Sequence, residues 1–340
     1  MATLTNLLTQ LTDTARTERL LNTLVIHPAL LAIDEDASRA VIAQALNALL
    51  FEDLLYRVPA AKLYVDRCVE KHETVFHDHG AVRTVDASGM GELPRGQESI
   101  TRILRPLGYE LRGTYPLDRL KMTGRSYAQA DFPEDIAQFF ISELHVDRFD
   151  DSFAKGVHNV TRHSLDPLPP AAQGLLAKLE STGYLSIEEA VQLLPVLVKC
   201  FDRQHPEPSV ADYETLLAQS AEMAWIATEG NAFNHVTDRV ADVQQLTVDQ
   251  KALGQPMKDK VEVSGTGRVR QTAFLAARIQ RQFRQQDGTT LSREVPGSFL
   301  EFIARDYIPG EATRAVEKPA LDLSFDPSNA QAIFKMTASQ

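Results

Sequence analysis

Two short segments of the chain combine a histidine and an arginine at the same spacing. One is His79-Gly-Ala-Val-Arg83, and the other is His235-Val-Thr-Asp-Arg239, far along the sequence. Residues i, i+2 and i+4 of a β-strand point to one face, so each histidine would share a face with its arginine. Imidazole is a common metal ligand, and a guanidinium binds a carboxylate through two parallel hydrogen bonds. The segments therefore predict a metal held between two repeats beside an acidic substrate, with Arg83 the stronger substrate-binding candidate and Arg239 equally well explained by a structural ion pair.

A third candidate ligand lies in the apolar segment SFLEFIAR, where Glu301 stands between Leu300 and Phe302. A carboxylate buried in such a strand is costly unless it has a partner. A cation already bound by two neutral imidazoles would be that partner. Two histidines and one carboxylate form the facial triad of non-haem Fe(II) oxygenases, which leaves positions open for substrate and dioxygen. The residues predict an Fe(II) site made of His79, His235 and Glu301, with Zn, Ni or Mn as alternatives.

Three alternatives stay open at this point. His77 shares the predicted face of His79 and is the main rival ligand. Glu301 could instead pair with an arginine such as Arg83. Ser142, in the strand-like segment IAQFFISEL, lies near the position that matches Glu301 in the first repeat. If Ser142 faces inward, the metal has three protein ligands and an open side.

The order of the predicted elements repeats along the chain. From Val75 the sequence indicates a strand, a helix near 97–107 and three more strands, and the same βαβββ order recurs after about residue 231. Neither copy could cover both faces of its strands alone. We expect an α+β fold in which two βαβββ modules form a curved sheet around a metal cavity. The predicted divisions are a helical N-terminal layer (1–70), the first module (71–149), a helical insertion (150–230), the second module (231–307) and an irregular C-terminal tail (308–340).

Composition narrows the class of partner. The chain has 340 residues and a formal net charge of -11, which opposes binding to nucleic acid or to an anionic membrane and favours a small-molecule substrate. The two cysteines, Cys68 and Cys200, are predicted to be buried thiols in a reducing compartment. A secretory leader and an apolar run of about 18 residues are both missing from the sequence, so we expect a cytoplasmic protein. No pattern predicts an oligomeric state.

The segments HGAVRTV, GYELRGTY, FNHVTDRV and FLEFIAR resemble the 2-oxoadipate dioxygenase/decarboxylase family. That family belongs to the vicinal oxygen chelate, or glyoxalase-like, superfamily, and the resemblance covers roughly residues 70–150 and 215–307. Carried over position by position, it implies iron ligands at His79, His235 and Glu301. It also implies a substrate-carboxylate arginine at Arg83.

The resemblance implies an enzyme of lysine catabolism that combines a 2-oxo dicarboxylic acid with O2. Fe(II) would chelate the 2-oxo acid, and the products would be CO2 and a 2-hydroxy acid one carbon shorter. Bacterial members complete their substrate pocket with a C-terminal extension, whereas this sequence ends at Gln340, so the substrate's chain length stays open. Two other classes also stay open: a redox-silent glyoxalase-like lyase or isomerase, which would take up no oxygen, and a protein that binds a small acid without turnover.

Overall fold

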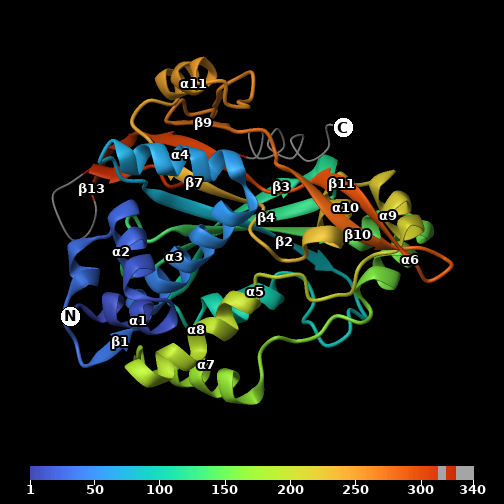
Figure 1. The fold of residues 1–340 in the computed structure, drawn as a ribbon, viewed down its shortest axis with the longest axis horizontal. Coiled ribbons are helices and arrows are strands. Elements are labelled where there is room, and N and C mark those ends of the chain that lie inside the picture. The colour runs from blue at the N-terminus through green and yellow to red at the C-terminus, as the bar shows by residue number, and fades with distance from the viewer. Residues whose placement is uncertain (313–318, 327–340) are drawn as a thin grey trace.

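The structure is a computed structural model and describes residues 1–312 and 319–326. Its main feature is an eight-stranded sheet that curls into a half-barrel at the centre of the molecule (Figure 1). In spatial order its strands are β3 (Tyr109–Leu117), β4 (Met122–Gln129), β5 (Gln138–His145), β2 (His77–Asp86), β7 (His235–Arg239), β12 (Phe299–Arg305), β9 (Val269–Ala273) and β8 (Glu262–Val263). β2 and β7 are antiparallel neighbours, and each is parallel to the last strand of its own half, β5 or β12. The same arrangement is therefore repeated on both sides of the central β2–β7 pair.

The order of elements agrees with the predicted fold class. The first half runs β2, α5 (Glu98–Leu104), β3, β4 and β5, and the second runs β7, α11 (Val243–Ala252), β8, β9 and β12. A hairpin of β10 (Arg278–Arg284) and β11 (Thr290–Pro296), which the sequence analysis did not predict, follows β9 and precedes β12 along the chain and forms a separate two-stranded sheet. The α+β fold with a curved sheet is confirmed, and the hairpin is an addition to it.

Two groups of helices cover the two faces of the sheet. The first group packs with Val82, Phe139 and Leu300 in the larger apolar core, and the second packs with Val85 and Leu144 in a smaller one. The first group contains α1 (Thr3–Leu11), α3 (Arg39–Arg57), α4 (Pro59–Glu70), α7 (Pro170–Thr182) and α8 (Ile187–Lys199), with α2 (Thr14–Thr23) beside them. The second contains α6 (Asp151–Thr161), α9 (Val210–Leu217) and α10 (Ala221–Glu229). In Figure 1, α1, α3, α7 and α8 lie at the lower left, and α6, α9 and α10 lie at the right.

Local sequence explains where α8 begins. Ser186 and Glu189 form a capping box at α8, in which the Ser186 hydroxyl accepts from the Glu189 amide at 3.2 Å and the Glu189 carboxylate accepts from the Ser186 amide at 2.9 Å. The short strand β6 (Tyr184–Ser186) leads into this cap and pairs with β1 (Asp36–Ser38). This pairing joins the predicted helical insertion to the N-terminal helices.

Three further expectations concerned the cysteines, membrane-spanning segments and the C-terminal tail. Cys68 and Cys200 are buried free thiols, as predicted. Within the described ranges, none of the helices has the length and apolar character needed to cross a membrane. The predicted irregular tail was partly wrong, because β13 (Tyr307–Ala312) pairs with β14 (Pro319–Leu321). Parts of that predicted tail, 313–318 and 327–340, lie outside the described residues.

Candidate metal centre

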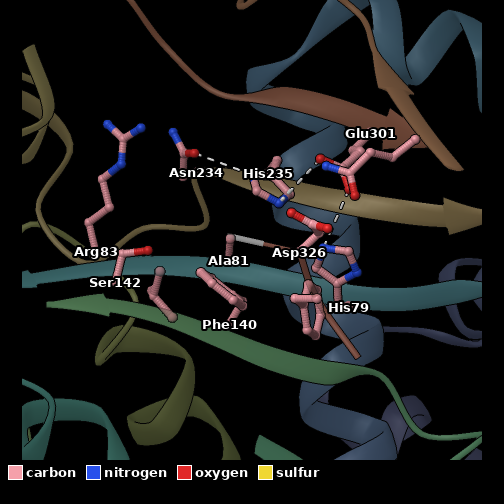
Figure 2. Close-up of a pocket in the computed structure, with 12 residues that line it drawn as sticks. His79, Ala81, Arg83, Phe140, Ser142, Asn234, His235, Glu301 and Asp326 are labelled. Carbon is pink, nitrogen blue, oxygen red and sulfur yellow. Dashed lines mark hydrogen bonds and ion pairs between the residues drawn. The ribbon is translucent and has the colours of Figure 1, made fainter. Parts of the chain in front are cut away.

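The three predicted ligands come from adjacent strands: His79 from β2, His235 from β7 and Glu301 from β12. In the register of the sheet, Thr237 lies opposite both His79 and Glu301, and His235 precedes Thr237 by two residues. Side chains two residues apart on a strand share a face. All three ligands therefore line one cavity on the same face of the sheet (Figure 2).

The ligand atoms lie close enough for one ion to bridge them. Nε2 of His79 is 3.6 Å from Oε1 of Glu301, and Nε2 of His235 is 3.9 Å from Oε2 of the same carboxylate. The three ligand atoms all lie within 4.8 Å of one another. Two atoms bound to one ion at about 2.1 Å lie no more than about 4.2 Å apart, and the separations of 3.6 Å and 3.9 Å meet this limit. The structure thus brings together the three residues that the sequence analysis selected.

Burial sets the charge of the three ligands. It lowers the pKa of both His79 and His235, so the two imidazoles are neutral and able to bind a metal. It raises the pKa of Glu301 to about 8. Among the residues that the structure describes, Oε2 of Glu301 has no hydrogen-bond partner. A divalent cation would be a partner for this buried carboxylate, so the donor set fits a metal.

Metal binding is expected to release a proton at neutral pH. Glu301 must be ionised to bind a cation, and its pKa in the metal-free protein is about 8. Below pH 8 the ion displaces this proton, so the apparent affinity should rise by up to about tenfold per pH unit towards pH 8 and level off above it. Calorimetric titration with Zn(II) at pH 7, in buffers of different ionisation enthalpy, would count the protons released. An affinity independent of pH with no released proton would contradict this prediction.

A β-bulge in β2 separates His77 from His79. The register between β2 and β7 shifts between these two residues. The ring centroid of His77 lies 5.4 Å from that of Phe51 and 6.4 Å from that of Phe233, whose ring also covers the opposite face of β2 at Gly80. The prediction that His77 shares a face with His79 was wrong, because the extra residue of a bulge interrupts the alternation of side chains.

Arg83 lies in the same cavity, at the end away from Glu301 (Figure 2). Its guanidinium carbon is 4.9 Å from the ring centroid of Trp225, and the residue is 1% exposed. Burial lowers the pKa of Arg83 to about 10, which leaves the side chain charged at neutral pH. A buried guanidinium beside a cavity suits an anionic ligand. The other lining residues are Ala81, Val82, Phe140, Ser142, Asn234, Gln271, Phe325 and Asp326.

Ser142 faces the cavity, where it lies opposite Arg83 in the register of β2 and β5. Ser142 was expected near the position that matches Glu301, and it lies near that position but not at it. Counted from the residues that pair with the two histidines, the position equivalent to Glu301 is Phe140, two residues before Ser142. Phe140 offers no ligand atom, so the first half of the sheet contributes a single residue, His79, to the predicted triad.

Arg239 is placed differently from Arg83. Its Nε donates to Oδ2 of Asp78 at 2.6 Å, and its Nη1 donates to the carbonyl oxygen of Glu134 at 3.0 Å. The guanidinium also lies over the ring of Phe76, and the residue does not line the cavity. These contacts agree with the structural ion pair that the sequence analysis weighed for Arg239.

The segment that follows β14 forms one wall of the cavity. Arg305 Nη1 donates to the backbone carbonyls of Asp322 and Ser324, both at 2.9 Å. Phe325 then packs edge-on against His79, with 4.8 Å between the ring centroids. The wall is thus fastened to the same strand, β12, that carries Glu301.

Two residues at the centre were missed by the sequence analysis. Asp78 Oδ1 lies 2.9 Å from Nδ1 of His79, and the Thr237 hydroxyl lies 3.0 Å from Nε2 of His79 and 3.4 Å from Oε1 of Glu301. Alternation from His235 could have indicated Thr237. For Asp78, alternation along β2 predicts the wrong face. The bulge that causes this difference leaves no signal in the sequence.

A second group of possible ligands consists of Asp86, Glu143 and His145. Each of its carboxylates already has an arginine partner: Asp86 pairs with Arg95, and Glu143 pairs with Arg125 at 2.9 Å. His145 Nδ1 in turn lies 3.0 Å from Asp86. These contacts account for the group, and we assign no metal to it.

Residues 44–335 match the protein family described as 2-oxoadipate dioxygenase/decarboxylase. A curated relative, the chloroplastic 2-oxoadipate dioxygenase/decarboxylase of Arabidopsis thaliana, is 25% identical over 306 residues. That alignment covers 82% of this chain and 72% of the relative.

Solved structures share the fold. A glyoxalase-superfamily protein from Ralstonia eutropha JMP134 is 54% identical, with a TM-score of 0.89 over 95% of this chain and 98% of the other. Hydroxyglutarate synthase from Oryza sativa, in complex with 2-oxoadipate, is 19% identical, with a TM-score of 0.67 over 88% and 93% of the two chains. The synthase from Pseudomonas putida, also in complex with 2-oxoadipate, is 18% identical, with a TM-score of 0.62 over 89% and 74%. At this identity the two synthases establish a common fold.

Proposed function

This chain belongs to the 2-oxoadipate dioxygenase/decarboxylase family, and from that membership we propose that it is a non-haem Fe(II) enzyme acting on a 2-oxo dicarboxylic acid and O2. The proposed products are CO2 and a 2-hydroxy acid one carbon shorter. For 2-oxoadipate the product is 2-hydroxyglutarate. The atoms of 2-oxoadipate and one O2 equal those of 2-hydroxyglutarate and one CO2, so the reaction needs no external reductant.

One observation carries the proposal: a triad of two neutral histidines and a buried carboxylate shares its cavity with a buried guanidinium. His79, His235 and Glu301 form the triad, and Arg83 is the guanidinium. A triad of this kind leaves coordination positions open, and the arginine gives the cavity a site for an acid group. This combination suits a substrate that chelates through one end and carries a carboxylate.

Iron bound at the triad would supply open positions for the 2-oxo acid and O2 and the electrons that activate oxygen. The residues of the chain bind and shield the substrate. Arg83 binds a substrate carboxylate, which fixes the direction in which the acid lies in the cavity. Ala81, Phe140 and Phe325 give the cavity apolar walls, which keep water away from the reacting atoms.

The proposal is tested by oxygen consumption. Protein loaded with Fe(II) under anaerobic conditions is mixed with air-saturated buffer and 2-oxoadipate, with 2-oxoglutarate and buffer alone as controls. We expect O2 uptake matched by equal amounts of CO2 and 2-hydroxyglutarate. Stoichiometric bound iron without O2 uptake on any 2-oxo acid would contradict the proposed reaction.

A redox-silent lyase or isomerase is the second candidate. The same three ligands suit Zn, Ni or Mn, because a ligand set does not by itself select the metal. The observation behind this candidate is the donor set itself, because two histidines and one glutamate also serve as the ligands of catalytic zinc. Turnover of an acid by the Zn-loaded protein without O2 would support it, and Fe(II)-dependent O2 uptake would exclude it.

A further inference from the structure

Asp78 is a buried carboxylate beside the proposed ligand His79. It is 1% exposed, and its Oδ1 lies 2.9 Å from Nδ1 of His79. A carboxylate held by arginines accepts hydrogen bonds, so Nδ1 of His79 carries the hydrogen and Nε2 keeps its lone pair. Nε2 is the atom that lies 3.6 Å from Glu301. The contact therefore selects the tautomer that a metal ligand requires.

Two arginines from the second half of the sheet hold Asp78 in place. Arg239 of β7 binds Oδ2 at 2.6 Å, and Arg305 of β12 binds Oδ1 at 2.8 Å. The arginines are themselves anchored, Arg239 to the carbonyl of Glu134 at 3.0 Å and Arg305 to that of Asp322 at 2.9 Å. The carboxylate is thus fixed by three neighbouring side chains from three strands.

The bulge in β2 is what brings Asp78 to this position. Strict alternation would place Asp78 on the face opposite to His79, among the helices of the larger core. The register shift between His77 and His79 instead turns Asp78 and His79 towards the same side. Bulges are frequent next to active sites, where they redirect a side chain.

The second proposed histidine ligand is held by different means. Nδ1 of His235 lies 3.3 Å from Oδ1 of Asn234, which is a neutral amide. Its ring stacks on Phe299, with 4.8 Å between centroids and 27° between planes. Hydrogen bonds to a charged group are about twice as strong as neutral ones. His79 is therefore the ligand whose orientation depends on a charge.

We propose that Asp78 is a positioning residue of the metal centre. It orients the ring of His79 and makes the lone pair of Nε2 a stronger ligand for the metal. Partners of this kind keep a ligating histidine in one tautomer and orientation. Arg239 then acts through Asp78 and not on the substrate. The inference rests on the metal site of the proposed function, but it does not depend on the oxygen chemistry.

The test is the affinity and spectrum of bound Co(II) in the full-length Asp78→Asn variant. Asparagine keeps the shape and removes the charge. We expect Co(II) to bind about 10- to 100-fold more weakly, as is usual when such a partner is lost, with a shifted visible absorption spectrum.

Glu229→Gln is the matched control. Glu229 is another buried carboxylate, bound by Arg281 at 2.6 Å and 2.8 Å, and it does not line the metal cavity. This variant should lose stability and keep the Co(II) affinity and spectrum of the unaltered protein. Equal weakening of Co(II) binding in both variants would show a general structural effect and overturn the inference.

A double variant separates the loss of the Asp78 contact from misfolding caused by an unbalanced buried charge. Asp78→Asn with Arg239→Gln removes one charge of each sign, so the buried cluster keeps its charge balance, and we again expect weaker Co(II) binding. Arg239→Gln alone should also weaken Co(II) binding. If Arg239 bound the substrate directly, that variant would raise KM for the acid and leave Co(II) affinity unchanged.

The possible outcomes separate this inference from the proposed function. Unchanged Co(II) affinity and spectrum in the Asp78 variants would overturn the inference and leave the proposed function standing. Failure of the unaltered protein to bind Co(II) would overturn both. Weakened Co(II) binding in the variants, together with no O2 uptake by the Fe(II)-loaded protein, would support the inference and remove the proposed oxygenase activity.

Discussion

Replacing Glu301 with glutamine should abolish the retention of iron and, with it, the uptake of O2. Glu301 is the only acidic member of the proposed triad and is 1% exposed. Glutamine preserves its shape but leaves a divalent ion with neutral ligands in a buried site. Loss of an outer partner already costs about 10- to 100-fold in metal affinity, so loss of the charged ligand itself should cost at least about 100-fold. Metal analysis after gel filtration would measure the effect.

Glu52→Gln is a suitable control for this substitution. Glu52 is also a buried glutamate, but it lies in α3 and pairs with Arg16. Its replacement should leave the iron content unchanged. A Glu301→Gln protein that kept both iron and activity would show that Glu301 does not belong to the metal centre.

Replacing Arg83 with methionine should lower kcat/KM for a 2-oxo dicarboxylic acid and leave the iron content intact. Truncating one partner of a buried, charged hydrogen bond costs about 2–5 kcal/mol, which corresponds to roughly 30- to 5,000-fold. Arg83 and Glu301 lie at different ends of the cavity, so the metal should stay bound (Figure 2). Steady-state O2 uptake against substrate concentration would measure the loss.

Two comparisons sharpen the test of Arg83. Arg83→Lys keeps the charge and loses the planar pair of donors, so its activity should fall between those of the unaltered and methionine proteins. 2-Oxohexanoate lacks the distal carboxylate of 2-oxoadipate. If Arg83 binds that distal group, the methionine variant should lose little activity on 2-oxohexanoate. Equal losses on both acids would instead assign Arg83 to the carboxylate next to the keto group.

The residues that the sequence analysis found share one property: their position follows from simple alternation along a strand. His79 and His235 occur at the same place in two similar segments, and Glu301 is conspicuous because its neighbours are apolar. The sheet then brings these segments together through the β2–β7 and β7–β12 pairs. Repetition therefore made the fold class and the two histidines predictable, and the apolar neighbours of Glu301 made that residue predictable.

What escaped prediction depends on backbone geometry that leaves no mark in the pattern of residue types. The bulge at β2 reversed the faces expected for His77 and Asp78. The register places Phe140, two residues before Ser142, at the position equivalent to Glu301. The β10–β11 hairpin was missed because its strands, RIQRQFR and TLSREVP, contain few apolar residues.

The cavity wall after β14 is attached by backbone hydrogen bonds, in addition to the Arg268–Asp322 ion pair and the packing of Phe325. Arg305 and Gln138 donate to carbonyl oxygens of residues 322–324, and the amide of Phe325 donates to the Tyr115 hydroxyl. None of these hydrogen bonds depends on which side chain stands at position 325. The hydrogen bonds that fix the path of the wall are therefore independent of the residue at position 325, while the ring of Phe325 lines the cavity and contacts the proposed ligand His79.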